Sequence, residues 1–155
     1  NCIVSHGSWD GWLAAPYAAK HGAPVNHGPR TMDTSRSSLT QRDGRLIGGA
    51  AEYVKAGVPL FSLNTDSPVI AEEYLFLQGS MSARLGADPY AMLRAVTTHP
   101  AQSILVGDRV GSLEVGKDAD IVITTGDPLD PRSRVELVLI DGKIQYSRER
   151  DGQWF

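Results

Sequence analysis

Two side chains able to bind a metal ion and to move protons, His6 and Asp66, each follow an apolar run in this 155-residue chain. An imidazole nitrogen and a carboxylate oxygen are common zinc ligands. Such an ion polarises a carbonyl group and lowers the pKa of a bound water to about 7. A carboxylate beside that water can take its proton and pass it to a leaving group. The two residues therefore predict part of a hydrolytic metal site, in which both are catalytic and metal-ligating.

The same residues also allow other interpretations. Ser67-Pro68 has the composition of a helix start, so Asp66 could simply cap a helix. His6 could be a hydrogen-bonded core histidine. His27 also follows a short apolar run and is a candidate substrate-binding residue, as is Arg30, which begins a long polar segment. A solvated loop is the competing interpretation for Arg30.

The elements that must position these groups follow from hydrophobic periodicity. Short buried strands are predicted at 2–5, at 23–26 and just before Asp66, with helices around 12–18 and 46–54 between them. This alternation favours parallel strands joined by crossover helices. Polar residues at the ends of such strands are typical of an α/β barrel, which builds its active site at the carboxyl ends of its strands.

Two more helices are predicted after the third strand. The first covers 68–85, and the second begins at Asp88-Pro89, where an N-cap residue precedes a proline. The two remaining histidines, His21 and His99, lie at predicted helix ends. We expect both to be structural.

The pattern changes to β-structure after residue 106. Strands are predicted at 121–123 and 135–140, and Asp141-Gly142 between apolar runs predicts a tight hairpin turn. This part is too small to build a core of its own, so we expect it to complete a larger sheet. We therefore predict two domains, 1–106 and 107–155.

Three segments of the chain resemble signature segments of the amidohydrolase superfamily. Residues 64–68 resemble the Gly-Thr-Asp signature of barrel strand 8, with Asn64 in place of the glycine. Residues 88–101 resemble a segment in which a helix ends in Ala-Thr-x-Asn-Pro-Ala. Residues 109–122 resemble the segment that contains Gly-Lys-Asp-Ala-Asp before a strand. The branch most similar is that of the imidazolonepropionase-related amidohydrolases.

The resemblance implies a metal-dependent hydrolase acting on carbon–nitrogen bonds of non-peptide amides, cyclic amides or amidines. It implies an α/β fold, namely the C-terminal part of a (β/α)8 TIM barrel followed by part of a small β-sandwich. Asp66 would be the strand-8 metal ligand and general base, His6 the strand-6 histidine, and His27 would end strand 7. One or two divalent metal ions, expected to be zinc, would serve the complete enzyme.

The chain also departs from the family pattern, because it lacks the His-x-His pair of strand 1. We therefore expect a C-terminal fragment that starts at about strand 6. Two candidate ligands are fewer than the three or more that a hydrolytic site takes, so the chain alone is expected to be inactive. The alternatives are a non-catalytic amidohydrolase-like protein used for binding or as a scaffold, and a stand-alone small binding protein.

Composition and charge limit the kinds of binding partner and the cellular location that we expect. The net charge of −3 makes no electrostatic case for nucleic acid or an anionic membrane. No apolar run reaches the roughly 18 residues that cross a bilayer. A single cysteine, Cys2, excludes an intrachain disulfide and favours a reducing compartment, so we expect a cytoplasmic protein. We also expect a small-molecule substrate and a complete protein that is a homo-oligomer.

Overall fold

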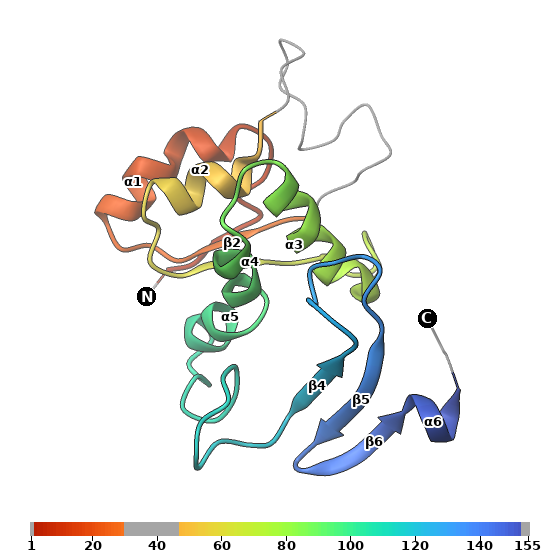
Figure 1. Ribbon diagram of the computed structural model, residues 1–155. Helices are drawn as coiled ribbons and strands as arrows, with labels where there is room; N and C mark the ends of the chain where they lie inside the picture. The colour runs from red at the N-terminus through yellow and green to blue at the C-terminus, as the bar shows by residue number, and fades with distance from the viewer. Residues whose placement is uncertain (1, 30–46, 153–155) are drawn as a thin grey trace.

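Three parallel strands form the first sheet of the computed structural model, which describes residues 2–29 and 47–152 (Figure 1). Their order is β1-β2-β3, and their bounds are Val4–Ser5, Val25–His27 and Phe61–Leu63. The helices before β2 and β3 are η1 (Trp9–Ala14), α1 (Ala15–Lys20) and α2 (Gly49–Lys55). The predicted alternation of parallel strands and crossover helices is confirmed within this region.

The two faces of the sheet differ in polarity because side chains alternate along a strand. Val25 and Phe61 are buried in the main core, which they share with residues of the covering helices, among them Tyr53 and Met92. Ser5, Asn26 and Ser62 are paired in register across the three strands. The Ser62 hydroxyl donates to the Asn26 side-chain oxygen over 3.2 Å. The opposite face of the sheet therefore carries a polar row.

The first strand is exposed, contrary to the prediction of a buried strand at 2–5. Ile3 and Val4 are 38% and 42% exposed. Within the described residues β1 pairs only with β2, so its other edge is open. A strand at the edge of a sheet leaves its apolar side chains uncovered on that side.

The segment after β3 turns before it becomes helical, so the predicted helix at 68–85 begins too early. The Val69 amide donates to the Asp66 carbonyl over 2.8 Å, and the Ile70 amide donates to the Thr65 carbonyl over 3.2 Å. The helical residues that follow are η2 (Glu72–Tyr74) and α3 (Leu75–Arg84). The left-handed backbone of Asp66, with φ of 50°, starts this turn and prevents a helix from continuing directly out of the strand.

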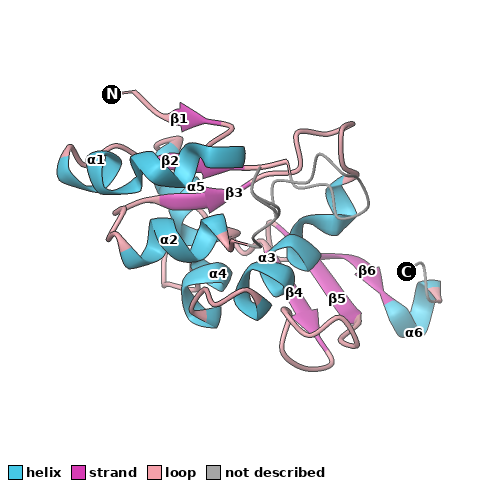
Figure 2. Cartoon of the chain, turned by 90° about the horizontal axis from the view of Figure 1, so that it is seen from above, coloured by secondary structure: helices cyan, strands magenta, loops and turns pink. Residues whose placement is uncertain are grey.

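The helix predicted from Asp88-Pro89 is confirmed. It is α4 (Pro89–Ala95), and the Asp88 carboxylate accepts from the Ala91 amide over 2.7 Å as an N-cap. The short helix α5 (Thr98–Ser103) follows it, and both helices contact β3. Figure 2 shows the helices placed around the parallel strands, with the second sheet lying beyond α3.

The second sheet is antiparallel, with strand order β4-β5-β6. Its strands are Ile121–Thr124, Val135–Ile140 and Lys143–Ser147, and the short helix α6 (Arg148–Asp151) follows. The hairpin predicted at Asp141-Gly142 is confirmed, because both residues have positive φ, 51° and 71°, as a type I′ turn requires.

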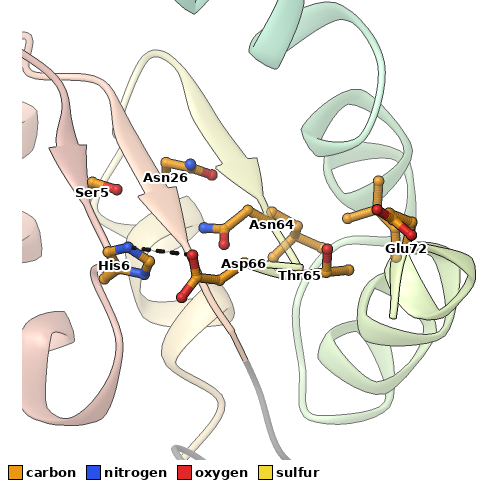
Figure 3. A pocket seen from close by; sticks show the side chains of 9 residues that line it. Ser5, His6, Asn26, Asn64, Thr65, Asp66 and Glu72 are labelled. Carbon is orange, nitrogen blue, oxygen red and sulfur yellow. Dashed lines mark ion pairs between the residues drawn. The ribbon is translucent and has the colours of Figure 1, made fainter. Parts of the chain in front are cut away.

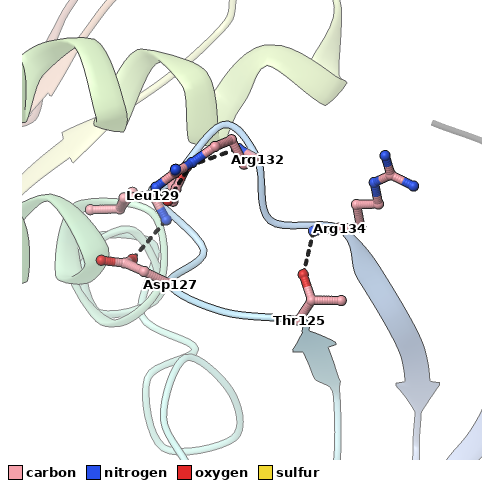
Figure 4. A network of polar contacts seen from close by, with 6 residues as sticks. Thr125, Asp127, Leu129, Arg132 and Arg134 are labelled. Carbon is pink, nitrogen blue, oxygen red and sulfur yellow. Dashed lines mark hydrogen bonds and ion pairs between the residues drawn. The ribbon is translucent and has the colours of Figure 1, made fainter.

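The loop between β4 and β5 joins the second sheet to the main core (Figure 4). Asp127 accepts from the Leu129 amide over 2.9 Å, and the Thr125 amide donates to the Arg134 carbonyl over 2.9 Å. These bonds hold the loop so that the Leu129 side chain is buried in the core cluster. Its Cδ2 atom packs on Gly79 of α3, where an added Cβ would lie only 3.0 Å away.

Removing this apolar anchor should destabilise the fold. Leu129→Ala is expected to lower the free energy of unfolding by about 2–4 kcal/mol, because it deletes buried methyl groups and leaves a cavity. Urea unfolding followed by circular dichroism measures this change. Leu113→Ala is the matched control, since Leu113 is 79% exposed and its loss should change the free energy by less than about 0.5 kcal/mol. Equal effects of the two substitutions would contradict the anchoring role.

His99 connects α5 to β3. Its Nδ1 lies 2.9 Å from the Phe61 carbonyl, and because a carbonyl only accepts, Nδ1 carries the hydrogen. Burial lowers the pKa of His99 and nearby Arg94 lowers it further, while the bond to Phe61 acts in the opposite direction. This contact confirms the structural role expected for His99.

The lowered pKa predicts a loss of stability in mild acid. Because the unfolded chain then binds more protons than the folded one, the free energy of unfolding should fall as the pH drops below the ordinary histidine value of about 6.5. His99→Asn keeps a donor near Nδ1 but does not titrate, so it should flatten this dependence. Urea unfolding at about pH 7.5 and about pH 5.5 compares the variant with wild type and with the exposed control His21→Asn. A wild-type pH dependence retained in His99→Asn would refute the assignment.

Candidate active site

The structure brings His6 and Asp66 together at the carboxyl edge of the parallel sheet (Figure 3). His6 follows β1 and Asp66 follows β3, and the two strands flank β2, so their backbones are about 10 Å apart. The side chains close this gap, with His6 Nε2 lying 3.9 Å from Asp66 Oδ1. Both side chains remain about half exposed, at 49% and 44%. They are therefore accessible to a small molecule.

The pair lies in an open cavity of about 350 Å³. Most of the residues that line it are polar: Ser5, His6, Asn26, Asn64, Thr65, Asp66 and Glu72. Of these only His6 and Asp66 were expected from the sequence. The cavity has the size and mixed lining of a site for a small molecule.

Both residues of the pair have left-handed backbone conformations, with φ of 56° at His6 and 50° at Asp66. Non-glycine residues rarely adopt this region, and such strain is concentrated at functional sites. The Asp66 carboxylate does not cap a helix, because Ala71 is the N-cap of η2 and α3 begins only at Leu75. The capping interpretation of Asp66 is therefore wrong.

The His6 ring has a defined orientation. Its Nδ1 lies 3.1 Å from the Gly28 carbonyl. Because a carbonyl can only accept, Nδ1 carries the hydrogen, and Nε2 faces Asp66. The Ser8 hydroxyl donates to the same carbonyl over 2.8 Å. This arrangement matches that of metal-binding histidines, whose second nitrogen donates to a backbone carbonyl.

His27, predicted to bind substrate, does not line the cavity. Its side chain is 1% exposed and packs against the rings of Tyr53 and Phe61. Strand alternation explains this position, because His27 lies two residues after the core residue Val25 and so shares its face. Direct contact with substrate would require the ring to leave the core.

Asn26 lines the cavity in place of His27. The sequence contained a signal for this, since Asn26 alternates with the apolar Val25 and must face the other way. Arg30, the second predicted substrate-binding residue, lies outside the described residues.

Asn64, which stands where the resemblance expects glycine, is held at the centre of the lining. Its amide donates to the His27 carbonyl over 3.0 Å, and its carbonyl accepts from Gln78 over 3.1 Å. Its side-chain Nδ2 is buried and has no hydrogen-bond partner within 2–29 and 47–152. An unpaired buried donor is costly, so the contacts of the Asn64 backbone must offset that cost.

The His6 nitrogen Nε2 and the Asp66 oxygen Oδ1 are placed so that both could bind one metal ion. Two ligands of one tetrahedral zinc ion, each about 2.1 Å from it, are about 3.4 Å apart. The separation of 3.9 Å between Nε2 and Oδ1 is close to that span. In the described part of the chain no group of three or more His, Cys, Asp or Glu side chains comes together to hold a metal. His6 and Asp66 can therefore supply two ligands and not a complete set.

Comparison with known proteins places the chain in a family. The sequence pattern of the Amidohydrolase family matches residues 17–145. The chain belongs to the Amidohydrolase family. The predicted membership of the amidohydrolase superfamily is thereby confirmed, and with it an α/β fold related to that of TIM-barrel proteins.

Individual amidohydrolases are similar to this chain in sequence and in structure. Amidohydrolase tasK of Hapsidospora irregularis is 35% identical over 103 residues, which are 66% of this chain and 10% of that protein. Imidazolonepropionase of Streptococcus pyogenes serotype M49 (strain NZ131) is 36% identical over 86 residues, which are 52% of this chain and 20% of that protein. The crystal structure of an amidohydrolase from Thermotoga maritima MSB8 has a TM-score of 0.81 and 34% identity, and the match covers 96% of this chain and 37% of that one.

The chain thus spans a tenth to a fifth of the length of these two curated relatives. In the described part of the chain, no helix is long and apolar enough to cross a membrane.

Proposed function

We propose that this amidohydrolase chain forms part of a metal-dependent hydrolase that cleaves carbon–nitrogen bonds of non-peptide amides, cyclic amides or amidines. The observation that carries the proposal is the approach of His6 Nε2 and Asp66 Oδ1 to 3.9 Å in an open cavity. In this proposal β1, β2 and β3 are the sixth to eighth strands of a (β/α)8 barrel. The strands β4–β6 belong to a β-sandwich, and the domains are 1–106 and 107–155.

His6 and Asp66 would hold a divalent metal ion, which we propose to be zinc, through Nε2 and a carboxylate oxygen. Members of this family generally use a divalent metal ion. When bound, it would polarise the carbonyl or amidine carbon and make a water molecule more acidic. The Gly28 carbonyl keeps the His6 ring turned with Nε2 toward Asp66.

Side chains of this chain would transfer the proton and contact the substrate. Asp66 would accept a proton from the attacking water and return it to the leaving nitrogen, which is the role of a carboxylate general base. Asn64 lines the cavity beside the pair and would shape the space that the substrate occupies. Glu72, on the rim of the cavity, faces the substrate.

The remaining ligands would come from other strands of a complete barrel. We propose that the complete protein is a cytoplasmic homo-oligomer acting on a small molecule. A non-catalytic binding or scaffold role is the alternative.

Zinc binding tests the site directly. Zn²⁺ added to the chain is expected to bind weakly, and the His6 and Asp66 side chains should both be required because they share one ion. Isothermal titration calorimetry should show at least about a 10-fold loss of affinity for His6→Ala and for Asp66→Ala. Asp108→Asn is the control, because Asp108 is an exposed carboxylate outside the cavity. Binding that survives both substitutions would contradict the proposed metal site.

Hydrolysis assays test the chemistry. The 155-residue chain alone should not accelerate zinc-dependent hydrolysis of amide or lactam substrates, because two ligands are too few for a tight site. Turnover above that of Zn²⁺ in buffer would refute this prediction. In the complete enzyme Asp66→Asn should lower kcat/KM by at least about 100-fold, while Asp108→Asn leaves it unchanged. Retention of activity by Asp66→Asn would rule out its role as general base.

A further inference from the structure

Two His-Gly dipeptides at the ends of adjacent strands hold each other. His6-Gly7 follows β1, and His27-Gly28 ends β2. His6 Nδ1 lies 3.1 Å from the Gly28 carbonyl, and His27 Nδ1 lies 2.6 Å from the Gly7 carbonyl. Each imidazole therefore donates to the glycine that follows the other. We refer to this pair of reciprocal hydrogen bonds as the histidine clasp.

We propose that the histidine clasp makes His27 a positioning residue for His6, in that the buried ring fixes the peptide after His6, so that the Gly28 carbonyl can set the orientation and the tautomer of the exposed ring. The significance of that orientation for metal binding rests on the function proposed above. The clasp itself does not, because it consists only of hydrogen bonds within this chain.

The His27 half of the clasp is rigid. The ring packs against Tyr53 and Phe61, with ring centroids 5.7 and 5.8 Å away. A Cβ added to Gly49 of α2 would lie 3.2 Å from His27 Cε1, so the helix backbone also covers the ring. A ring packed on these sides keeps one rotamer, and its Nδ1–H then holds the Gly7 carbonyl in place.

Gly7 transmits this restraint to His6. It directly follows His6, whose left-handed φ of 56° needs support from its surroundings. The Gly7 amide donates to the Asn26 carbonyl over 3.2 Å, and a Cβ at Gly7 would lie 2.8 Å from Val25 Cγ1. The peptide after His6 is therefore bonded to β2 through its amide and to His27 through its carbonyl.

Gly28 completes the clasp from the other side. Its φ is +147°, and a Cβ there would lie 2.1 Å from the Asn64 carbonyl oxygen, so only glycine fits. Its carbonyl accepts from both His6 Nδ1 and the Ser8 hydroxyl. The His6 backbone is thus held by His27 and the His6 ring by Gly28. The ring must carry its hydrogen on Nδ1, which leaves Nε2 free to face Asp66.

Nitrogen-15 long-range NMR of the imidazole rings tests this proposal in the 155-residue chain without added metal. The spectra are recorded at about pH 8, where neutral imidazole predominates. In wild type, His6 should be in the Nδ1–H form, whereas His21, which is exposed and contacts only the Tyr17 ring among the described aromatic pairs, should show a mixture of tautomers. A His6 signal with the same tautomer mixture as His21 would overturn the proposal.

Substitutions of His27 distinguish its proposed role in positioning His6 from a role in core packing alone. His27→Phe keeps an aromatic ring but removes the donor, so the His6 signal should move toward that of His21. His27→Asn places an amide nitrogen near the position of Nδ1 and should keep the Nδ1–H form at His6. An unchanged His6 signal in folded His27→Phe, judged by an unchanged His99 signal, would overturn the proposal.

A further pair of variants covers the case in which His27→Phe does not fold. Gln reaches further than Asn, so His27→Gln cannot place its amide nitrogen at the Nδ1 position. His27→Asn should keep the wild-type His6 signal and His27→Gln should lose it, while identical signals from the two would count against the clasp. Failure of zinc binding would leave these tautomer results unaffected, so the two proposals fail separately.

Discussion

Parallel pairing of three short strands is the constraint on which the site depends. Because β1, β2 and β3 run in one direction, all three carboxyl ends lie on one edge of the sheet. Residues far apart in the sequence, His6 and Asp66, then face each other across the end of β2 at 3.9 Å. An antiparallel partner in place of β3 would have put Asp66 at the opposite edge. The helices that lie between the parallel strands in sequence also bury one face of the sheet and leave the other polar.

The end of each strand is shaped by backbone conformations that extended residues do not adopt. His6 and Asp66 both have positive φ, and Gly28 has a φ that only glycine tolerates. Hydrogen bonds between neighbouring strand ends compensate for this strain, through His6, His27 and the carbonyls that they contact. The core and the site are thus connected, since a packed histidine of the core supports an exposed histidine of the cavity.

An apolar contact from the β4–β5 loop attaches the second sheet to helix α3. Leu129 packs on Gly79 of α3, and the hydrogen bonds of the loop present the leucine to the core. The same helix α3 contributes Leu75 to the cavity lining and Gln78 to the support of Asn64. The position of the second sheet and the shape of the cavity therefore depend on one helix.

Local sequence patterns were sufficient for the features that depend on neighbours in the chain. The parallel strand order, the Asp88 cap and the Asp141-Gly142 hairpin follow from short-range preferences and appear as predicted. The family and the choice of His6 and Asp66 as candidate site residues also came from short motifs. The start of the helix after Asp66 was wrong, because the motif could not show that Asp66 begins a turn.

Only the tertiary structure decided which side chains share the cavity. His27 was chosen from its place at a strand end, but strand alternation buries it among rings that come from α2 and β3. Asn26, Asn64 and Glu72 line the cavity through contacts between elements that no single segment encodes. The sequence by itself determined which residues could do chemistry, because residue type and local conformation are local properties. The distances between side chains, their burial and their tautomers depend on partners tens of residues away in the sequence. These properties are determined only by the pairing of the strands and the packing of the helices.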